Sequence, residues 1–226
     1  MHFATTCIDN FFKYPDSIRK YANSLEYNPD KEGRWPGVRT KSLQLLDENL
    51  HLMIAKKYLS NFYTMESIMG GQVQYGSDAV FQKVNNKYGR GWIHNDGKFV
   101  HTTIVYLTPN VPDDSGTSIY IPKEDSMPQA IPGTVLTLQK KIDFYKSRIS
   151  LEESEPYRLK NNSPFKEVIR FSNVYNRCIG FDGSNWHSAN NFANVEGEEE
   201  RLTLIIFWGS IVGPPTGLQR TRMNAI

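Results

Sequence analysis

The spacing of apolar residues changes about a third of the way along the chain. Before residue 70, apolar side chains recur every three or four positions, which is the period of an amphipathic helix. One such segment follows Pro15 and includes Tyr21 and Leu25. A second covers Leu46–Phe62, where Asp47 is a suitable N-cap because its side chain can accept a hydrogen bond from a free backbone amide. The first third is therefore predicted to be helical.

From residue 70 onward, short runs of β-branched and aromatic residues alternate with Gly, Pro, Asn and Asp. The candidate strands are Gln72–Tyr75, Ala79–Val84, Phe99–Leu107, Thr117–Ile121, Thr134–Leu138, Glu167–Phe171, Arg177–Phe181 and Leu202–Trp208. Evenly punctuated short strands predict an antiparallel sandwich or barrel. One helical interruption is expected at Gln139–Ile149, followed by a polar stretch to Pro164.

No internal repeat or linker-like tract divides the 226 residues, which favours one domain over residues 1–226. We expect a mainly β (α+β) fold in which a helical N-terminal part, residues 1–69, packs outside a β core at residues 70–213.

Composition narrows the functional classes. With 26 basic and 24 acidic residues the formal net charge is +2, which is too even to indicate nucleic acid as a partner. The most apolar segment, Leu202–Gly213, is shorter than the ~20 residues that cross a bilayer, and no signal peptide is apparent. Cys7 and Cys178 lie in no CxxC pair. We expect a soluble, cytoplasmic protein without a membrane partner, and the sequence leaves its oligomeric state open.

Two histidines stand in contexts that suggest metal binding. His94 and Asp96 are two residues apart just before an apolar strand, and side chains at that spacing in extended backbone point to the same side. Alone, such a pair is more often a surface turn. His187 follows the strand Arg177–Phe181 and would complete two imidazoles and one carboxylate. That set suits Fe(II) and leaves three positions open, whereas zinc more often takes three protein ligands and a water.

The last strand adds a candidate anion site. If Leu202 and its alternate neighbours face the core, Arg201 and Thr203 point to the opposite face. A guanidinium inside a barrel needs an anionic partner, because an unpaired buried charge is costly. A dicarboxylate would supply that partner through a bidentate pair with Arg201 and a bond to the Thr203 hydroxyl.

The order His94-x-Asp96, His187 and Arg201 resembles that of the Fe(II)/2-oxoglutarate-dependent dioxygenases, and it looks closest to their prolyl-4-hydroxylase-like branch. The similarity covers roughly Ala79–Trp208. Shorter segments that also resemble the family are Ile8–Phe12, Thr103–Pro109, Gly116–Tyr120 and Ile131–Leu136. The resemblance implies a double-stranded β-helix, a jelly roll of the cupin-like kind.

The resemblance also implies an activity. Iron would be held by His94, Asp96 and His187, and the cosubstrate 2-oxoglutarate would meet Arg201 and Thr203. Dioxygen would be the oxidant, with ascorbate as an accessory reductant. A protein or peptide side chain, or a small molecule, would be hydroxylated with release of succinate and CO2. Retention of Asp96 favours hydroxylation, since a small residue replaces it in halogenating relatives.

Other positions depart from the family pattern. Prolyl hydroxylases usually carry Lys where this chain has Arg201, and Asn85 replaces a Tyr nine residues before the first His. Ser118 replaces a Thr that often contacts the cosubstrate. Asn85, Ser118 and Tyr106 are therefore candidate cosubstrate contacts, although an aromatic residue on such a strand is more often part of the core. The long connection Gln139–Ser172 is expected to form a substrate lid.

Two other readings stay open. The same β core could be a cupin-like metal-binding protein or an isomerase that does not use 2-oxoglutarate, but such a protein has no need of an inward-facing Arg201. A non-catalytic interaction domain would not need the complete ligand set. The sequence does not identify the substrate, because loops rather than the fold determine specificity.

Overall fold

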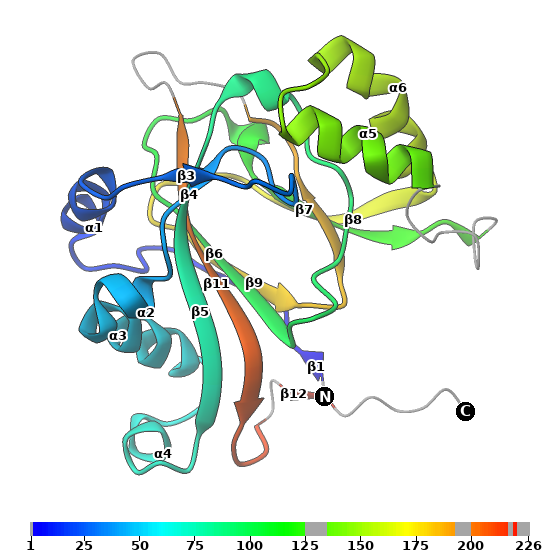
Figure 1. Cartoon of the computed structure of the whole chain (residues 1–226). Coiled ribbons are helices and arrows are strands. Elements are labelled where there is room, and N and C mark those ends of the chain that lie inside the picture. Colours follow the sequence, from blue (N-terminus) through cyan, green and yellow to red (C-terminus); the bar gives the residue numbers. More distant parts are fainter. Residues whose placement is uncertain (1, 125–134, 193–199, 217–218, 221–226) are drawn as a thin grey trace.

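The computed structural model describes residues 2–124, 135–192, 200–216 and 219–220, and its centre is a pair of β-sheets (Figure 1). The strands are β1 (His2–Phe3), β2 (Thr6–Ile8), β3 (Asn28–Pro29), β4 (Val38–Arg39), β5 (Gln74–Val84), β6 (His101–Tyr106), β7 (Thr117–Pro122), β8 (Phe165–Phe171), β9 (Cys178–Asp182), β10 (Trp186–Ala189), β11 (Arg201–Val212) and β12 (Gln219–Arg220). The helices are α1 (Pro15–Asn23), α2 (Leu43–Leu46), α3 (Glu48–Leu59), α4 (Met65–Met69), α5 (Val135–Tyr145) and α6 (Leu151–Asn162), with 3-10 turns η1 (Asn86–Tyr88) and η2 (Asp113–Ser115). Among these described helices, none combines the length and the hydrophobicity that crossing a bilayer requires.

The strands form a jelly roll, the double-stranded β-helix expected from the sequence. The larger sheet has seven strands in the order β2-β9-β6-β11-β5-β4-β3, and the smaller has three in the order β10-β7-β8. Neighbouring strands within both sheets are antiparallel. A short β1-β12 pair is separate from both sheets. Connections run back and forth between the sheets, so residues far apart in sequence meet on the inner faces.

Strand β11 lies at the centre of the larger sheet and separates two environments. One set of alternate side chains, Leu202, Leu204, Ile206 and Trp208, is buried in the main hydrophobic core. The other set, Arg201, Thr203, Ile205 and Phe207, lines an internal cavity. This alternation is the one predicted from the sequence, because successive side chains of a strand point to opposite faces.

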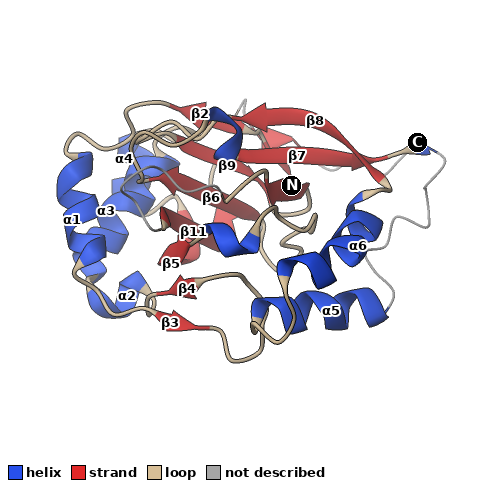
Figure 2. Ribbon diagram, turned by 90° about the horizontal axis from the view of Figure 1, so that it is seen from above, coloured by secondary structure: helices blue, strands red, loops and turns tan. Residues whose placement is uncertain are grey.

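The N-terminal helices cover the outer face of the larger sheet, as Figure 2 shows. Helix α3 contributes Ile54, Tyr58 and Leu59 to the same core as β11. Its start is fixed by Asp47, whose Oδ1 accepts a 2.9 Å hydrogen bond from the backbone amide of Leu50. The predicted N-cap and the predicted packing of these helices outside the β core are both confirmed.

Several element predictions need correction. The predicted strands Gln72–Tyr75 and Ala79–Val84 are parts of one long strand, β5, which begins at Gln74, so residues 72 and 73 lie before it. The predicted strand Thr134–Leu138 is wrong: residues 135–138 open helix α5, and residues 131–134 lie outside the described part of the chain. The helix predicted at Gln139–Ile149 is real, but it starts earlier and ends at Tyr145.

The N-terminal part is also not purely helical. Strand β2 extends the larger sheet beside β9, and β4 pairs with β5 in the register Arg39–Gln82. The polar stretch before Pro164 contains a second helix, α6, which packs against α5. Figure 2 shows α5 and α6 on the side of the sheets opposite to α1–α3.

Candidate metal centre and its cavity

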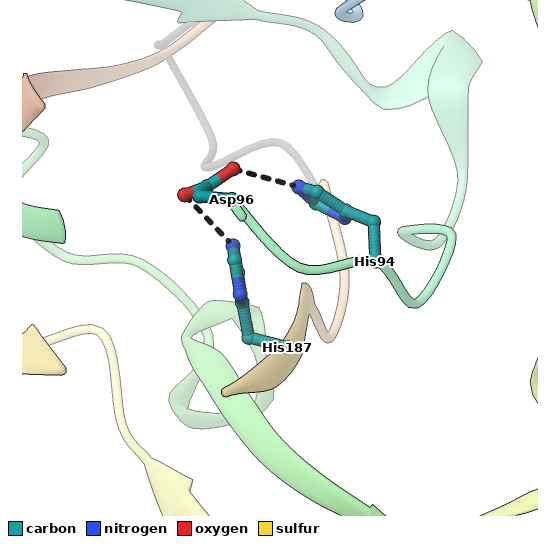
Figure 3. Close-up of side chains that lie close together, drawn as sticks. All are labelled: His94, Asp96 and His187. Carbon is teal, nitrogen blue, oxygen red and sulfur yellow. Dashed lines mark ion pairs between the residues drawn. The ribbon is translucent and has the colours of Figure 1, made fainter. Parts of the chain in front are cut away.

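Three side chains converge at one end of the jelly roll (Figure 3). His94 and Asp96 come from the loop between η1 and β6, and His187 comes from β10. The Nε2 atom of His94 lies 3.8 Å from Asp96 Oδ1, and the Nε2 atom of His187 lies 3.5 Å from Asp96 Oδ2. One potential ligand atom from each residue lies within 4.8 Å of the other two. These three residues were assigned to one site from the sequence, and in the structure they lie next to one another.

Backbone hydrogen bonds join the two histidines. The amide of His94 donates to the carbonyl of His187 at 3.0 Å, and the amide of His187 donates to the carbonyl of His94 at 2.8 Å. This reciprocal pair forms a β-bridge between the loop before β6 and the smaller sheet. As a result, the two rings lie with their centroids 4.4 Å apart.

The same local geometry fixes which ring nitrogen is available. His94 Nδ1 lies 2.8 Å from the carbonyl oxygen of Trp92, and His187 Nδ1 lies 3.0 Å from that of Asn185. A carbonyl oxygen only accepts hydrogen bonds, so in each ring Nδ1 carries the proton. The lone pair is then on Nε2, the atom that faces Asp96, which is the tautomer that metal-binding histidines need.

Asp96 is positioned by two further contacts. The hydroxyl of Thr102 donates to Asp96 Oδ2 at 2.8 Å, and the Asp96 amide donates to the carbonyl of Gly183 at 2.9 Å. No residue with a side chain fits at position 183, because its Cβ would overlap the carbonyl oxygen of Phe99. The turn after β9 can therefore approach the loop that carries Asp96 only with glycine at this position.

Electrostatics keep His94 and Asp96 in the protonation states that bind a cation. Burial, reinforced by His187 and Lys141, lowers the pKa of His94 to about 3, so the ring is neutral at physiological pH. Burial alone would raise the pKa of Asp96, but His187, His94 and the Thr102 hydrogen bond lower it overall. His94 is therefore a neutral imidazole and Asp96 a carboxylate, the forms in which each can donate a lone pair to a metal ion.

This donor set fits a divalent metal ion. Two imidazole nitrogens and one carboxylate oxygen on one side leave further coordination positions open toward the cavity, the arrangement typical of non-haem Fe(II) sites. The side chain of His94 is 44% exposed and faces the cavity, whereas that of His187 is 6% exposed. The open side is therefore reachable by small molecules.

The cavity next to the three residues has a volume of about 570 Å³, within the usual range for small-molecule sites of roughly 300–1,000 Å³. Arg201 lines it and is buried, with its guanidinium 5.3 Å from the ring centre of Tyr106 and 5.6 Å from that of Phe192. Burial lowers the pKa of Arg201 from its ordinary value, and the nearby Tyr106 opposes this shift.

Arg201 has an open hydrogen-bonding position. Its Nε atom is buried with no hydrogen-bond partner, and no carboxylate in the described part of the chain forms an ion pair with it. A buried guanidinium in that situation is suited to an incoming carboxylate. Thr203 lies two residues along the same strand and also lines the cavity, so its hydroxyl is available on the same wall.

None of the three remaining candidate cosubstrate contacts is part of the cavity wall, although Tyr106 lies directly beside Arg201. Asn85 follows β5 outside the cavity wall, which Val84 lines instead. Ser118 is buried in β7 but is not part of the wall, because Thr117 is the residue of that strand that faces inward. Tyr106 is fully buried behind the wall, where its hydroxyl donates to Thr117 Oγ1 at 2.9 Å.

Sequence reasoning missed several residues of the cavity. Thr102 supports Asp96, Arg39 and Trp35 come from the N-terminal part, and Lys141 comes from α5. The alternation in β6 would have marked Thr102 as facing inward, since Ile104 of the same strand also lines the cavity. No local sequence signal marks Arg39, because its placement depends on the pairing of β4 with β5.

Fold and site together define a jelly-roll protein with a two-histidine, one-carboxylate centre that opens into a small-molecule cavity. The chain belongs to a family of unknown function, DUF6445, whose model matches residues 3–207. That match spans all three candidate metal ligands and Arg201. No curated protein matches the sequence.

Solved structures share the fold at low sequence identity. HygX from Streptomyces hygroscopicus, crystallised with nickel, 2-oxoglutarate and hygromycin B, is 12% identical with a TM-score of 0.53, over 92% of this chain and 83% of HygX. EvdO2 from Micromonospora carbonacea var. aurantiaca is 10% identical with a TM-score of 0.52, over 97% of this chain and 91% of EvdO2.

A third neighbour is SnoN from nogalamycin biosynthesis, described as a non-haem alpha-ketoglutarate-dependent epimerase. It is 13% identical with a TM-score of 0.50, over 99% of this chain and 87% of SnoN. At these identities the similarities establish the fold. The prolyl-4-hydroxylase-like branch stays a prediction from the sequence motifs.

Proposed function

We propose that this protein is an Fe(II)- and 2-oxoglutarate-dependent oxygenase. The observation that carries the proposal is that the open side of His94, Asp96 and His187 faces the same cavity as the buried, unpaired Arg201. A metal-binding protein without an acidic cosubstrate would have no use for that guanidinium. The fold shared with HygX, which was crystallised with nickel and 2-oxoglutarate, supports the proposal.

Each residue has a defined task. His94 and His187 would bind the metal through Nε2, with their tautomers held by Trp92 and Asn185, and Asp96 would bind through a carboxylate oxygen. Arg201 would donate two N–H bonds to the far carboxylate of 2-oxoglutarate, and Thr203 would add a hydroxyl donor. The bound metal would supply the oxidation of substrate by dioxygen, coupled to conversion of 2-oxoglutarate into succinate and CO2.

The motif order favours the prolyl-4-hydroxylase-like branch, with ascorbate as an accessory reductant. Asp96, retained as a ligand, favours hydroxylation of a small molecule or a peptide side chain as the outcome. SnoN is an epimerase on the same fold, so the outcome has to be read from the product. A product that gains one oxygen atom by mass spectrometry supports hydroxylation, and a product of unchanged mass supports isomerisation.

The test is an anaerobic titration followed by spectroscopy. Adding Fe(II) and then 2-oxoglutarate should produce a weak charge-transfer band near about 500 nm, as expected when a 2-oxo acid chelates ferrous iron at such a centre. Asp96→Ala should abolish the band by removing the metal. Arg201→Gln should keep metal binding and weaken 2-oxoglutarate binding by about 2–3 kcal/mol, the cost of losing a charge-assisted pair.

Arg170→Gln is the matched control, because Arg170 lies on the exposed side of β8 in a surface pair with Glu167. It should leave both affinities unchanged. Metal binding with no affinity for 2-oxoglutarate would contradict the proposal and favour a cupin-like metal protein or isomerase.

A further inference from the structure

The cavity holds more positive charge than 2-oxoglutarate alone would require. Its cationic lining residues are Arg34, Arg39, Lys98, Lys141 and Arg201, and its acidic ones are Asp78 and Asp96. Arg34 and Lys98 are exposed, and Arg34 is already paired with Asp30 at 2.9 Å. Arg39 and Lys141 are the two cations, besides Arg201, that lie inside.

The Arg39 guanidinium is packed against two aromatic rings, but no carboxylate of the described residues neutralises its charge. Its guanidinium lies 4.3 Å from the ring centre of Trp35 and 5.4 Å from that of Phe207, and it donates one hydrogen bond to Gln82 Oε1 at 3.3 Å. Its Nε is buried with no hydrogen-bond partner. No carboxylate of the described residues forms an ion pair with it, and Asp96, Asp30 and Asp78 act on it only at longer range.

Lys141 approaches the same region from helix α5. It lines the cavity and acts electrostatically on both His94 and Asp96. Burial lowers the pKa of its ammonium group to about 8, partly offset by Asp96. The ammonium group makes no ion pair with a carboxylate of the described residues.

The charges of the proposed metal and cosubstrate do not neutralise all the cationic side chains of the cavity. A divalent metal, the Asp96 carboxylate, the two carboxylates of 2-oxoglutarate and the Arg201 guanidinium together carry no net charge. Asp78, the remaining acidic residue of the lining, is exposed and acts on Arg39 only at longer range. Arg39 and Lys141 are therefore not fully compensated in the partly enclosed cavity, which is a costly arrangement without an anion. Trp35 and Phe207 line the cavity beside Arg39, where Trp35 also contacts Arg34 and Phe207 also contacts Phe99.

We propose that the substrate is a small molecule that carries a carboxylate or phosphate group, bound by Arg39 and Lys141, with its apolar part against Trp35 and Phe207. This inference rests on the proposed oxygenase function and extends it to the substrate class. The guanidinium of Arg39 would use its free Nε–H and a neighbouring N–H in a bidentate contact.

The experiment measures binding without turnover. Protein loaded with Ni(II) and saturated with 2-oxoglutarate is titrated calorimetrically with benzoate and phenyl phosphate, and with their neutral counterparts benzamide and phenol. Wild type should bind the anions at least about tenfold more tightly than the neutral compounds, as expected for a charge-assisted contact. Arg39→Gln and Lys141→Gln should each remove most of that preference.

Two further variants test whether the effect is specific to Arg39 and Lys141. Lys98→Gln removes an exposed cation of the cavity lining and should change anion affinity by less than about twofold. Arg39→Lys retains the charge without the planar fork and should recover part of the preference, which separates charge loss from misfolding.

Several outcomes would overturn the inference. One is equal affinity for benzoate and benzamide, and another is no binding by any probe. Weakened metal binding with an unchanged anion preference in Arg39→Gln would mean that Arg39 only neutralises Asp96. Loss of 2-oxoglutarate binding in that variant would make it a cosubstrate anchor. If the proposed function is wrong, the protein will not bind 2-oxoglutarate, and this is seen before any substrate probe is added. The same probes are then titrated without 2-oxoglutarate, which tests anion binding by Arg39 independently of the proposed function.

Discussion

Thr102 shows how a single hydroxyl can control a metal ligand. It donates to the oxygen of Asp96 that lies nearest His187, and so orients a carboxylate that would otherwise rotate. Contacts of this kind commonly change metal affinity by about 10–100-fold. Thr102→Val should therefore weaken Ni(II) binding within that range, as measured by calorimetry.

Thr102→Ser is the informative control, because it keeps the hydroxyl and should retain near wild-type affinity. Equal Ni(II) affinities in the Val and Ser variants would show that Thr102 only fills space. A direct effect on the fold is checked by comparing the melting temperatures of the two variants without metal.

A second residue-scale feature is the buried histidine His101. The hydroxyl of Tyr58 lies 2.5 Å from His101 Nε2, and burial lowers the pKa of His101 to about 3, with Asp182 opposing the shift. In the unfolded chain the pKa is about 6.5. Between these values the unfolded state binds a proton that the folded state excludes, so acid favours unfolding.

We expect the stability due to neutral His101 to be complete above about pH 6.5. It should fall by up to about 1.4 kcal/mol per pH unit as the pH drops from there toward 3. Urea unfolding at pH 7, 6 and 5, in the presence of a chelator, measures the slope. His101→Gln should give a shallower slope than wild type, and parallel slopes would contradict this account.

The sequence was most informative where chemistry depends on residue type. His94, Asp96, His187 and Arg201 could be selected because few side chains bind metals or pair with buried anions. Asn85 and Ser118 were chosen by their position in a family pattern, and the cavity wall is formed by their neighbours Val84 and Thr117 instead. Side-chain direction at a strand end depends on the exact register, which the sequence does not specify.

Among the elements, the packing of α3 against β9 depends on one glycine. A Cβ at Gly180 would overlap the hydroxyl of Tyr58 and lie 2.8 Å from His101 Nε2. Gly180→Ala should therefore displace the Tyr58 ring and its hydrogen bonds to His101 and Thr6. Overpacking of a core typically costs about 1–3 kcal/mol, or roughly 2–10 °C in melting temperature for a chain of this length.

Gly209→Ala is the matched control within the same sheet. Its Cβ would have as its nearest neighbour the carbonyl oxygen of Gly76, at an ordinary 3.7 Å. Calorimetric melting should separate the two variants clearly, and equal melting temperatures would show that Tyr58 can move aside at no cost.

Elements with a sustained apolar period were predictable, and elements without one were not. In helix α3 the apolar residues repeat at helical spacing over several turns, and in strand β11 they alternate over many positions. The type of each element is therefore clear from its sequence pattern. Residues 135–138 form a short apolar run, a pattern that is compatible with either a strand or a buried helix. In the structure these residues are helical, because α5 packs against α6. Helix α6 was missed because it is polar and contains Pro156; its capping box, Ser150 with Glu153, is the sequence signal that would have indicated its start.

For the whole molecule, ligand binding should be visible as stability. A metal and cosubstrate that bind only the folded protein raise its stability by about 2.7 kcal/mol at a concentration 100 times their dissociation constant. That corresponds to roughly 5–10 °C in melting temperature at this size. Ni(II) with 2-oxoglutarate should produce this shift by scanning calorimetry, and a chelator should reverse it.

His187→Ala is the variant that should show no shift, since it removes a metal ligand. An equal shift in wild type and His187→Ala would place the stabilising metal elsewhere on the protein.

The cavity as a whole lay beyond sequence reasoning. Its walls combine β4, β5, β11 and α5. Arg39 lies beside Gln82, and Gln82 beside Thr203, because three strands from distant parts of the chain pair in this register. His94 and Asp96 could be proposed because their motif is local, and His187 because the order of the residues along the chain resembles that of a known family. The substrate side of the cavity depends instead on long-range strand pairing.

The reciprocal amide bonds between His94 and His187 also determine how the centre is assembled. Because the backbone already holds the two histidines together, binding of a metal would not require a large rearrangement, and its rate should follow solvent access rather than folding. Conversely, a local opening that separates the smaller sheet from the loop before β6 would break the bridge and separate the two histidines. Deuterium uptake at these two amides would therefore measure how often the centre opens, and a bound metal should slow it.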